Sequence, residues 1–280
     1  MTRRYRDEFG FVPLDVTIAF EGGRISPLSS FNEAVNDVSA SFDRNGVFCP
    51  PEYARDLYKL KPTHEIILHN VNDYSDVREV RLSDGGAVIQ LVAYIFGVRT
   101  QFHDWWFDSK IPCKSTHNLI ITQSRLNEFM SHAYISWQAW NDEVRKLFIN
   151  ILYMNSRFVS YNWDWEKFTI GYMVLDGCFK CTKLLDGIKS GTHETRINRL
   201  CQHYQLREEK DNIERIVELR NQLFHESLWS NSQPCTAPEG DAFGQVYNLH
   251  RFNNRLIMAI IGFETDYIKS SWTIFGDFVL

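Results

Sequence analysis

The strongest constraint on the fold is a series of amphipathic helical patterns that fills the chain from about Thr122 onward. In each pattern apolar residues recur every three or four positions, as they do in a helix with one buried face. The patterns cover residues 123–154, 164–188, 193–204, 210–226 and 242–268. Thr192 is a suitable N-cap for the third. Because short loops connect these segments, we predict an antiparallel helical bundle.

The N-terminal part has a different pattern. Up to about Gly85 it is rich in turn residues and in short β-type runs, such as "PLDVTIAF", "EIILHNV" and "VREVRLSDGG", while "SSFNEAVNDVSASF" has a helical alternative. A buried helix is predicted from Ala87 toward the aromatic segment Gln101–Asp108. We therefore predict a mainly α protein: a smaller N-terminal α/β region, 1–120, ending in a helix, and a helical domain, 121–280.

Charge and hydropathy limit the classes of partner. The formal net charge is -5, so binding to nucleic acid through the overall field is not expected and any such contact must be local. The longest apolar run, "AVIQLVAYIFGV", is too short to span a bilayer, and no apolar run of signal-peptide length follows the N-terminus. These features predict a cytoplasmic protein without a membrane partner.

The cysteines do not suggest a disulfide framework, because all six are scattered along a chain without a secretory signal. Cys178 and Cys181 form a Cys-x-x-Cys pair inside a helical pattern, and no second pair follows at the spacing of a zinc site. We interpret the two as small core-facing residues; metal binding or redox chemistry is the alternative. We predict no metal and no cofactor.

One charged residue conflicts with its helical pattern. On the segment 210–226, Ile213, Val217, Arg220 and Phe224 fall within a sector of about 60°, which puts Arg220 near the centre of the predicted apolar face. A guanidinium keeps its proton and is seldom fully buried without a partner. Arg220 therefore either pairs with an acidic side chain of its own chain or faces an anionic ligand.

Two polar residues flank this arginine. Asn221 and His225 are four positions apart and so lie on the same side of the predicted helix. Histidine exchanges protons near neutral pH, arginine binds phosphate through paired hydrogen bonds, and an asparagine amide can orient either group. The three residues together suit phosphodiester chemistry.

At these residues the sequence resembles the HEPN family. The stretch "RNQLFH", Arg220 to His225, has the Arg-Asn-x-x-x-His form of that family's motif, lies late in a helical region and is followed by one more helix. The resemblance covers roughly Thr122 to Leu280. It implies a HEPN-like bundle and a homodimer in which two copies of the motif share one cleft. It also implies a bacterial defence or toxin effector, controlled by an antitoxin or another regulatory partner.

Carried onto this sequence, the resemblance gives Arg220 and His225 the catalytic positions and Asn221 the polar position that supports them. The implied activity is that of a metal-independent endoribonuclease on single-stranded RNA. The RNA 2'-hydroxyl attacks the adjacent phosphate, His225 acts as base or acid, and Arg220 stabilises the charge that develops on the phosphoryl oxygens. The alternative keeps the fold without catalysis, as a HEPN-like interaction or nucleotide-binding module.

The residues after the histidine depart from one HEPN subgroup, in which a tyrosine two positions beyond the histidine is modified. Ser227 stands there, so control by that route is not expected. Glu226 lies between the two and either supports His225 by orienting it or faces water.

Four arginines are candidates for a local RNA-binding surface: Arg196, Arg199, Arg215 and Arg251. The alternative is that they lie on solvated helix faces, paired with acids such as Glu209 and Glu214.

Two further segments have two interpretations each. The aromatic segment Gln101–Asp108 is more typical of a buried plug between the N-terminal region and the bundle than of a platform for a base. Metal binding by His103 and Asp108 has no second ligand pair to support it.

The loop Leu228–Asp241 follows the motif directly and either contacts substrate or serves as a connector.

Overall fold

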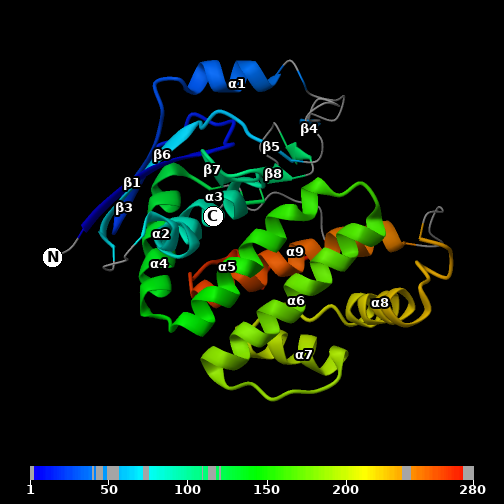
Figure 1. Cartoon of the computed structure of the whole chain (residues 1–280). Helices are drawn as coiled ribbons and strands as arrows, with labels where there is room; N and C mark the ends of the chain where they lie inside the picture. Colours follow the sequence, from blue (N-terminus) through cyan, green and yellow to red (C-terminus); the bar gives the residue numbers. More distant parts are fainter. Residues whose placement is uncertain are drawn as a thin grey trace. The chain divides into compact units, whose positions relative to one another are not determined.

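The computed structural model describes residues 3–39, 41, 47–48, 57–71, 76–108, 110–112, 118–119, 121–234 and 241–273. Helices make up most of it and strands a smaller share, which confirms the mainly α prediction. The chain divides between Ser160 and Tyr161 into two compact units, which we call unit 1 and unit 2 (Figure 1). The predicted division near residue 120 is therefore wrong, and the N-terminal unit is the larger of the two.

Unit 1 contains an antiparallel sheet with the strand order β2-β3-β6-β1-β7. Its strands are β1 (Arg3–Gly10), β2 (Ile18–Phe20), β3 (Gly23–Pro27), β6 (His64–Val71) and β7 (Gln101–Phe102). The run "EIILHNV" is confirmed as strand β6, and "PLDVTIAF" is a strand only over its last three residues.

The charged N-terminus forms a strand inside this sheet. Along β1 the side chains of Tyr5, Asp7 and Phe9 are buried and the charged residues between them are exposed, as the period of two in a strand requires. Asp7 is neutralised by Arg81, with 2.6 Å between the carboxylate and the guanidinium Nε. The buried acidic side chain of Asp7 is therefore paired with a cation that comes from another element.

Arg81 lies on a helix, although the sequence suggested a strand at this position. The residues "VREVRL" form α2 (Val77–Leu82). Asp76 caps the helix by accepting a hydrogen bond from the backbone nitrogen of Arg78. The apolar residues of this short run, Val77, Val80 and Leu82, are three and two positions apart, so periodicity does not separate strand from helix and the cap favours the helix.

Helix α3 (Asp84–Phe96) confirms the predicted buried helix, because every one of its residues is buried. It packs against α5 and α4, and it ends at Gly97, whose φ of 62° is the left-handed conformation that glycine adopts readily. Helix α1 (Phe31–Ser39) lies within the stretch "SSFNEAVNDVSASF", for which the sequence offered a helix as the alternative to a strand.

The first long helical pattern is broken in two and belongs to unit 1. Helix α4 (Gln123–Ala139) ends before Trp140, and α5 (Asp142–Ser156) starts after Asn141, whose side chain caps it through the nitrogen of Val144. A 3-10 turn, η2 (Arg157–Ser160), follows α5 and closes the unit.

Helix α4 covers the edge strand of the sheet, which is why the N-terminal unit extends to residue 160. Asn127 accepts a hydrogen bond from the backbone nitrogen of Ala19, and Ser131 accepts one from that of Glu21. An edge strand exposes unpaired donors that need partners. The side chains of α4 supply them, so α4 folds with the sheet (Figure 1).

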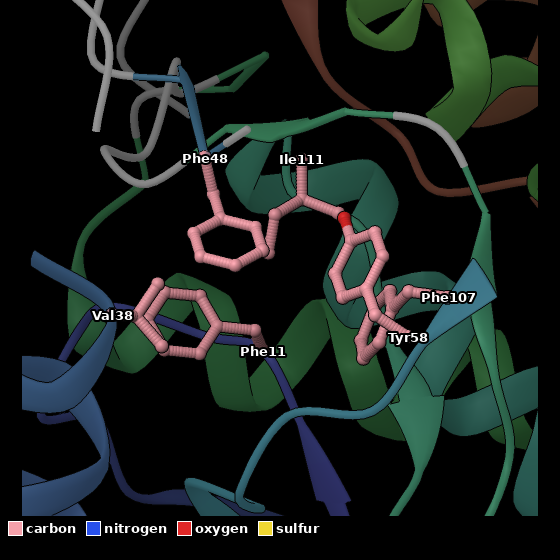
Figure 2. Packing of buried hydrophobic residues seen from close by; sticks show 6 residues of the cluster. All are labelled: Phe11, Val38, Phe48, Tyr58, Phe107 and Ile111. Carbon is pink, nitrogen blue, oxygen red and sulfur yellow. The ribbon is translucent and has the colours of Figure 1, made fainter. Parts of the chain in front are cut away.

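Two short strand pairs enclose a small aromatic core in unit 1. They are β4 (Val47–Phe48) with β9 (Ile111–Pro112), and β5 (Leu57–Tyr58) with β8 (Phe107–Asp108). Figure 2 shows the rings of Phe48, Tyr58 and Phe107 converging beside Ile111. Phe107 stacks on Tyr58 with 5.9 Å between ring centroids. Phe107 is buried within unit 1, whereas Trp106 of the same segment is 56% exposed, so the segment is buried only in part.

Unit 2 is built from helices. They are α6 (Asp164–Asp186), α7 (His193–Tyr204), α8 (Lys210–Asn221), the π-helical turn η3 (Gln222–Glu226), α9 (Ala242–Ile261) and α10 (Asp266–Lys269). The prediction for α7 is confirmed at both ends, and Thr192 caps it through the nitrogen of Thr195. The last predicted helix is interrupted at Gly262, which separates α9 from α10.

Helices α6 and α9 form the core pair of unit 2 (Figure 1). Gly171 lets them approach closely, since a Cβ at this position would lie 3.2 Å from Leu249, and Asn253 donates a 2.8 Å hydrogen bond to the Gly171 carbonyl. Among the described residues, no helix has both the length and the apolar composition that crossing a bilayer requires.

Candidate functional site

A change of helical winding brings the two motif residues together. In a regular α-helix, side chains five positions apart point about 140° away from each other. Here α8 gives way at Gln222 to the π-helical turn η3, whose hydrogen bonds span five residues. The wider turn places His225 next to Arg220, with 2.7 Å between Arg220 Nη1 and His225 Nε2.

The chemistry of the guanidinium fixes the direction of this contact. Arginine only donates hydrogen bonds, so His225 Nε2 is the acceptor, and the proton of the neutral ring lies on Nδ1. The same Nη1 also donates to Asn221 Oδ1 at 3.1 Å. The three predicted catalytic residues thus form one hydrogen-bonded group, in which the asparagine and the histidine both hold the arginine.

Arg220 is not at the centre of the buried face, contrary to the prediction from periodicity. The residues of this helix that are buried are Ile213, Ile216, Leu219 and Gln222. Arg220 is half-buried, and Phe224, which the α-helical pattern placed inside, is 46% exposed. The π-helical turn is the reason for Phe224, because it rotates every residue after Asn221. Arg220 precedes the turn and lies beside the buried face because α8 buries Ile213, Ile216 and Leu219.

Arg220 has no acidic partner among the described residues. Its guanidinium lies 5.5 Å from the ring centroid of Phe224 and 6.0 Å from that of Tyr172, and its Nε is buried without a hydrogen-bond partner in the described part of the chain. Within the described part of the chain, Arg220 is therefore not a salt-bridged core residue. The cation remains available to an anion.

Tyr172 and His193 lie beside the motif, although no pattern in the sequence indicated either residue. Tyr172 is a buried residue of α6, and its hydroxyl is 2.9 Å from His193 Nδ1. His193 is the half-buried first residue of α7, and its Nε2 has no hydrogen bond to any described residue. Helical periodicity predicts faces of single helices. It does not predict which helix ends meet, so no sequence signal indicated this pair.

Burial and charge set the protonation of the pair. Burial lowers the pKa of His193 below its usual range, and the positive charge of Arg220 lowers that pKa further. Burial raises the pKa of Tyr172, so its hydroxyl keeps its proton. His193 is accordingly neutral at neutral pH, as a proton acceptor must be.

A second arginine borders this group. Arg196, one turn along α7 from His193, lies 3.5 Å from Asp176 of α6 and donates a 2.9 Å hydrogen bond to the Gly191 carbonyl. Its charge acts on both His193 and Tyr172. We call Tyr172, His193, Arg220, Asn221 and His225 the motif cluster, and Arg196 lies at its edge.

The loop after the motif anchors the π-helical turn. The side-chain nitrogen of Gln222 donates to Glu218 and Asn231, and its oxygen accepts from the backbone nitrogen of Asn231 at 3.0 Å. Trp229 is 1% exposed and packs on Phe168, with 5.2 Å between ring centroids. The first part of the predicted loop is therefore fixed structure. Residues 235–240 lie outside the described residues.

The residues that follow His225 do not contact it. Glu226 is exposed and makes no hydrogen bond or ion pair with any described residue, so a role in orienting His225 is not seen. Ser227 ends the turn with φ at 57°, and the nitrogen of Leu228 then bonds back to the Gln222 carbonyl.

All four predicted RNA-binding arginines have partners within the fold, including Arg196, which pairs with Asp176. Arg199 donates to the carbonyls of Lys189 and Ser190. Arg215 pairs with Glu218 at 2.7 Å. Arg251 donates to the Trp272 carbonyl at 2.8 Å and so holds the segment that follows α10. Only Arg196 borders the motif cluster.

The residues considered as metal ligands are either buried in the fold or paired with other side chains. Cys178 and Cys181 are buried free thiols, and burial raises the pKa of both. Asp108 is held by Arg99 and Arg157. In the described part of the chain, no three histidine, cysteine or acidic side chains gather in a way that could hold a metal ion.

No family model, no curated protein and no solved structure matches this chain. The likeness to the HEPN family therefore rests on the motif residues of the sequence alone.

Proposed function

We propose that the protein is a metal-independent endoribonuclease that cleaves single-stranded RNA at the motif cluster. The observation that carries the proposal is the 2.7 Å contact between Arg220 and His225, made by a local π-helical turn. Such turns occur frequently at functional sites. Arg220 has no acidic partner among the described residues, so its charge is free to bind a phosphate.

The reaction makes one bond and breaks one. The RNA 2'-oxygen attacks phosphorus, the bond from phosphorus to the 5'-oxygen breaks, and the products are a 2',3'-cyclic phosphate and a free 5'-hydroxyl. A base takes the proton of the 2'-hydroxyl, and an acid gives a proton to the leaving oxygen. Arg220 stabilises the negative charge on the phosphoryl oxygens.

Two histidines of one chain divide the proton transfers in this proposal. Neutral His193 is the base: when its Nδ1 donates to the Tyr172 oxygen, Nε2 carries the free lone pair. His225 is the acid. When Arg220 donates to the phosphate instead, it releases His225 Nε2, and the proton that the leaving oxygen receives is carried there. Asn221 accepts a hydrogen bond from Arg220 Nη1 and so orients the guanidinium.

The HEPN-like bundle and the homodimer belong to the same proposal. Phe224 is 46% exposed and lies against Arg220, so an apolar surface borders the cluster. A second copy of unit 2 covers this surface in the dimer. Sedimentation equilibrium tests it: the wild-type chain is expected to be a dimer, and Phe224→Asp is expected to shift it toward monomer. The role as a bacterial defence or toxin effector, with an antitoxin or regulatory partner, rests on the family resemblance.

The activity test uses single-stranded RNA with excess chelator. The wild-type protein is expected to leave 2',3'-cyclic phosphate ends, and Arg220→Ala and His225→Ala are expected to abolish cleavage. Arg220→Lys keeps the charge but loses the paired donors, and we expect it to remain strongly impaired. His203→Ala is the matched control, because His203 lies at the far end of α7, where it pairs with Asp186.

The outcomes separate the two functional classes. Cleavage that neither Ala substitution affects would rule out the motif cluster as the active site. Folded protein that binds RNA or nucleotide without cleaving RNA would favour the non-catalytic HEPN-like interaction or nucleotide-binding module.

A further inference from the structure

Unit 1 contains a cavity whose lining includes no residue of the motif cluster. Its volume is about 690 Å³, within the range of small-molecule sites. Residues of α2, α3, α4 and α5 line it, together with the aromatic segment that starts at Gln101. All of them belong to unit 1, so the cavity is complete without any residue of unit 2.

Aromatic rings make up much of the cavity wall. Trp105, Trp137, Phe102 and Tyr153 all line it. Trp137 is held by a 2.8 Å hydrogen bond from its indole nitrogen to Asp84, and Trp105 meets Phe102 edge to face, with 5.4 Å between ring centroids. Phe102 and Trp137 are almost fully buried and support the wall, and the half-buried Trp105 offers a surface on which a planar group can stack at little entropic cost.

Positive charge gathers where α5 borders the cavity. Arg145 donates to the carbonyls of Trp137 and Gln138, which positions its guanidinium, and its side chain is 15% exposed. Lys146 is exposed and has no ion pair or hydrogen bond with any described residue. The one acidic residue of the lining, Asp142, is fully exposed and 3.9 Å from Arg145.

The remaining cation of the wall is already neutralised. Arg81 pairs with Asp7 and Asp104, each at 2.6 Å. The net charge open to a ligand is therefore positive and is concentrated at Arg145 and Lys146, on the α5 side.

A buried polar group in the wall also lacks a partner. Gln90 is 6% exposed, and its amide nitrogen faces the Thr100 carbonyl at 3.3 Å. Because that carbonyl only accepts, the amide oxygen must point the other way, and it has no hydrogen bond in the described part of the chain. An unsatisfied buried acceptor is destabilising until a donor reaches it.

We propose that this cavity binds a nucleotide. The base stacks on the ring of Trp105, and the phosphate pairs with Lys146 and Arg145. A planar ring with N–H donors and an anionic end matches the aromatic wall, the cationic border and the free acceptor of Gln90. The proposal goes beyond the nuclease function, since it gives unit 1 a ligand site of its own.

Calorimetric titration of the full chain with AMP tests the site. The titration is done in the Arg220→Ala background, so that phosphate binding at the motif cluster does not contribute to the result. AMP is expected to bind with a Kd below about 1 mM, and Trp105→Ala and Lys146→Glu are each expected to weaken binding by about tenfold or more. Trp105→Phe keeps a ring and should retain much of the affinity, which separates lost stacking from lost folding.

Two matched controls carry the same changes outside the cavity. Trp106→Ala removes the neighbouring tryptophan, which is 56% exposed and does not line this cavity, and Arg24→Glu reverses a charge on an exposed sheet position. Both should bind AMP like the parent. Adenosine should bind more weakly than AMP because it lacks the phosphate.

Several results would overturn the assignment. They are no binding of AMP, GMP, CMP or UMP at millimolar concentration, equal affinity in the cavity variants and the controls, or equal affinity for adenosine and AMP.

Discussion

At the scale of single residues, the motif cluster depends on which atoms can donate and which can accept. Arg220 can only donate, so its contact with His225 fixes the tautomer of the histidine. The sequence was sufficient to select Arg220, Asn221 and His225, because an arginine near an apolar face requires an explanation. It was not sufficient to find His193 and Tyr172, whose relation to the motif exists only after α6, α7 and α8 have packed.

The role of His193 leads to a prediction about pH. His193→Ala is expected to lower kcat/KM for RNA by about 100-fold or more, the usual contribution of a positioned base. In the wild-type protein, kcat/KM should fall as the pH drops through the lowered pKa of His193, because protonation removes the base. In His193→Ala, this fall of kcat/KM at low pH should be absent. A variant profile that kept the wild-type acid limb would assign the base to another group.

At the scale of elements, capping residues and changes of helical winding determine where helices begin, end and turn, which apolar periodicity alone does not predict. Helix α7 was predictable at both ends because Thr192 caps its start. The break between α4 and α5 was missed although Asn141 is a cap, because the apolar pattern continues across it. Strand β1 was missed because its outward residues are charged. The π-helical turn has no periodic signature, so the meeting of Arg220 and His225 could not be predicted geometrically.

The anchoring of that turn can be tested at Gln222. Gln222→Leu keeps the volume but removes the hydrogen bonds to Glu218 and Asn231, and it leaves the backbone nitrogen of Asn231 without an acceptor. We expect a loss of about 1–3 kcal/mol in the free energy of unfolding. Amide hydrogen exchange should accelerate across residues 222–232. Unchanged exchange there would mean that the turn is held by α8 alone.

The ion pair between β1 and α2 makes a second prediction at this scale. Arg81→Met leaves Asp7 buried without its cation, which should reduce the stability of unit 1 by about 3–5 kcal/mol. Chemical denaturation followed by tryptophan fluorescence measures the change. Arg78→Met, on the exposed side of the same helix, is the control, and an equal loss in both variants would contradict the role of the pair.

At the scale of the whole molecule, each unit buries a histidine whose neutral form the fold requires. Burial lowers the pKa of His64 in unit 1 to about 4 and that of His250 in unit 2 to about 3. A lowered pKa means that the stabilisation is complete above the unfolded value of about 6.5 and is lost as the pH falls toward the folded value. The division of the chain at residue 160 lets the two effects be followed separately.

The free energy of unfolding should therefore fall between about pH 6.5 and pH 4, by about 1.4 kcal/mol per pH unit for each histidine. Urea titrations at intervals of half a pH unit measure the slope. His64→Gln should reduce the slope in the unit 1 transition and leave the unit 2 transition unchanged. A slope that is the same with and without His64 would mean that carboxyl groups, and not this histidine, set the acid sensitivity.

The central claim is that the contact between Arg220 and His225 serves attack by an RNA 2'-hydroxyl. The most direct measurement compares two single-stranded RNAs, identical except for one 2'-deoxy nucleotide at a mapped cleavage position, in the presence of chelator. We predict that the wild-type protein cuts the first RNA there, leaving a 2',3'-cyclic phosphate, and leaves the second intact at that position. Equal cleavage of both RNAs at the deoxy position would contradict the account.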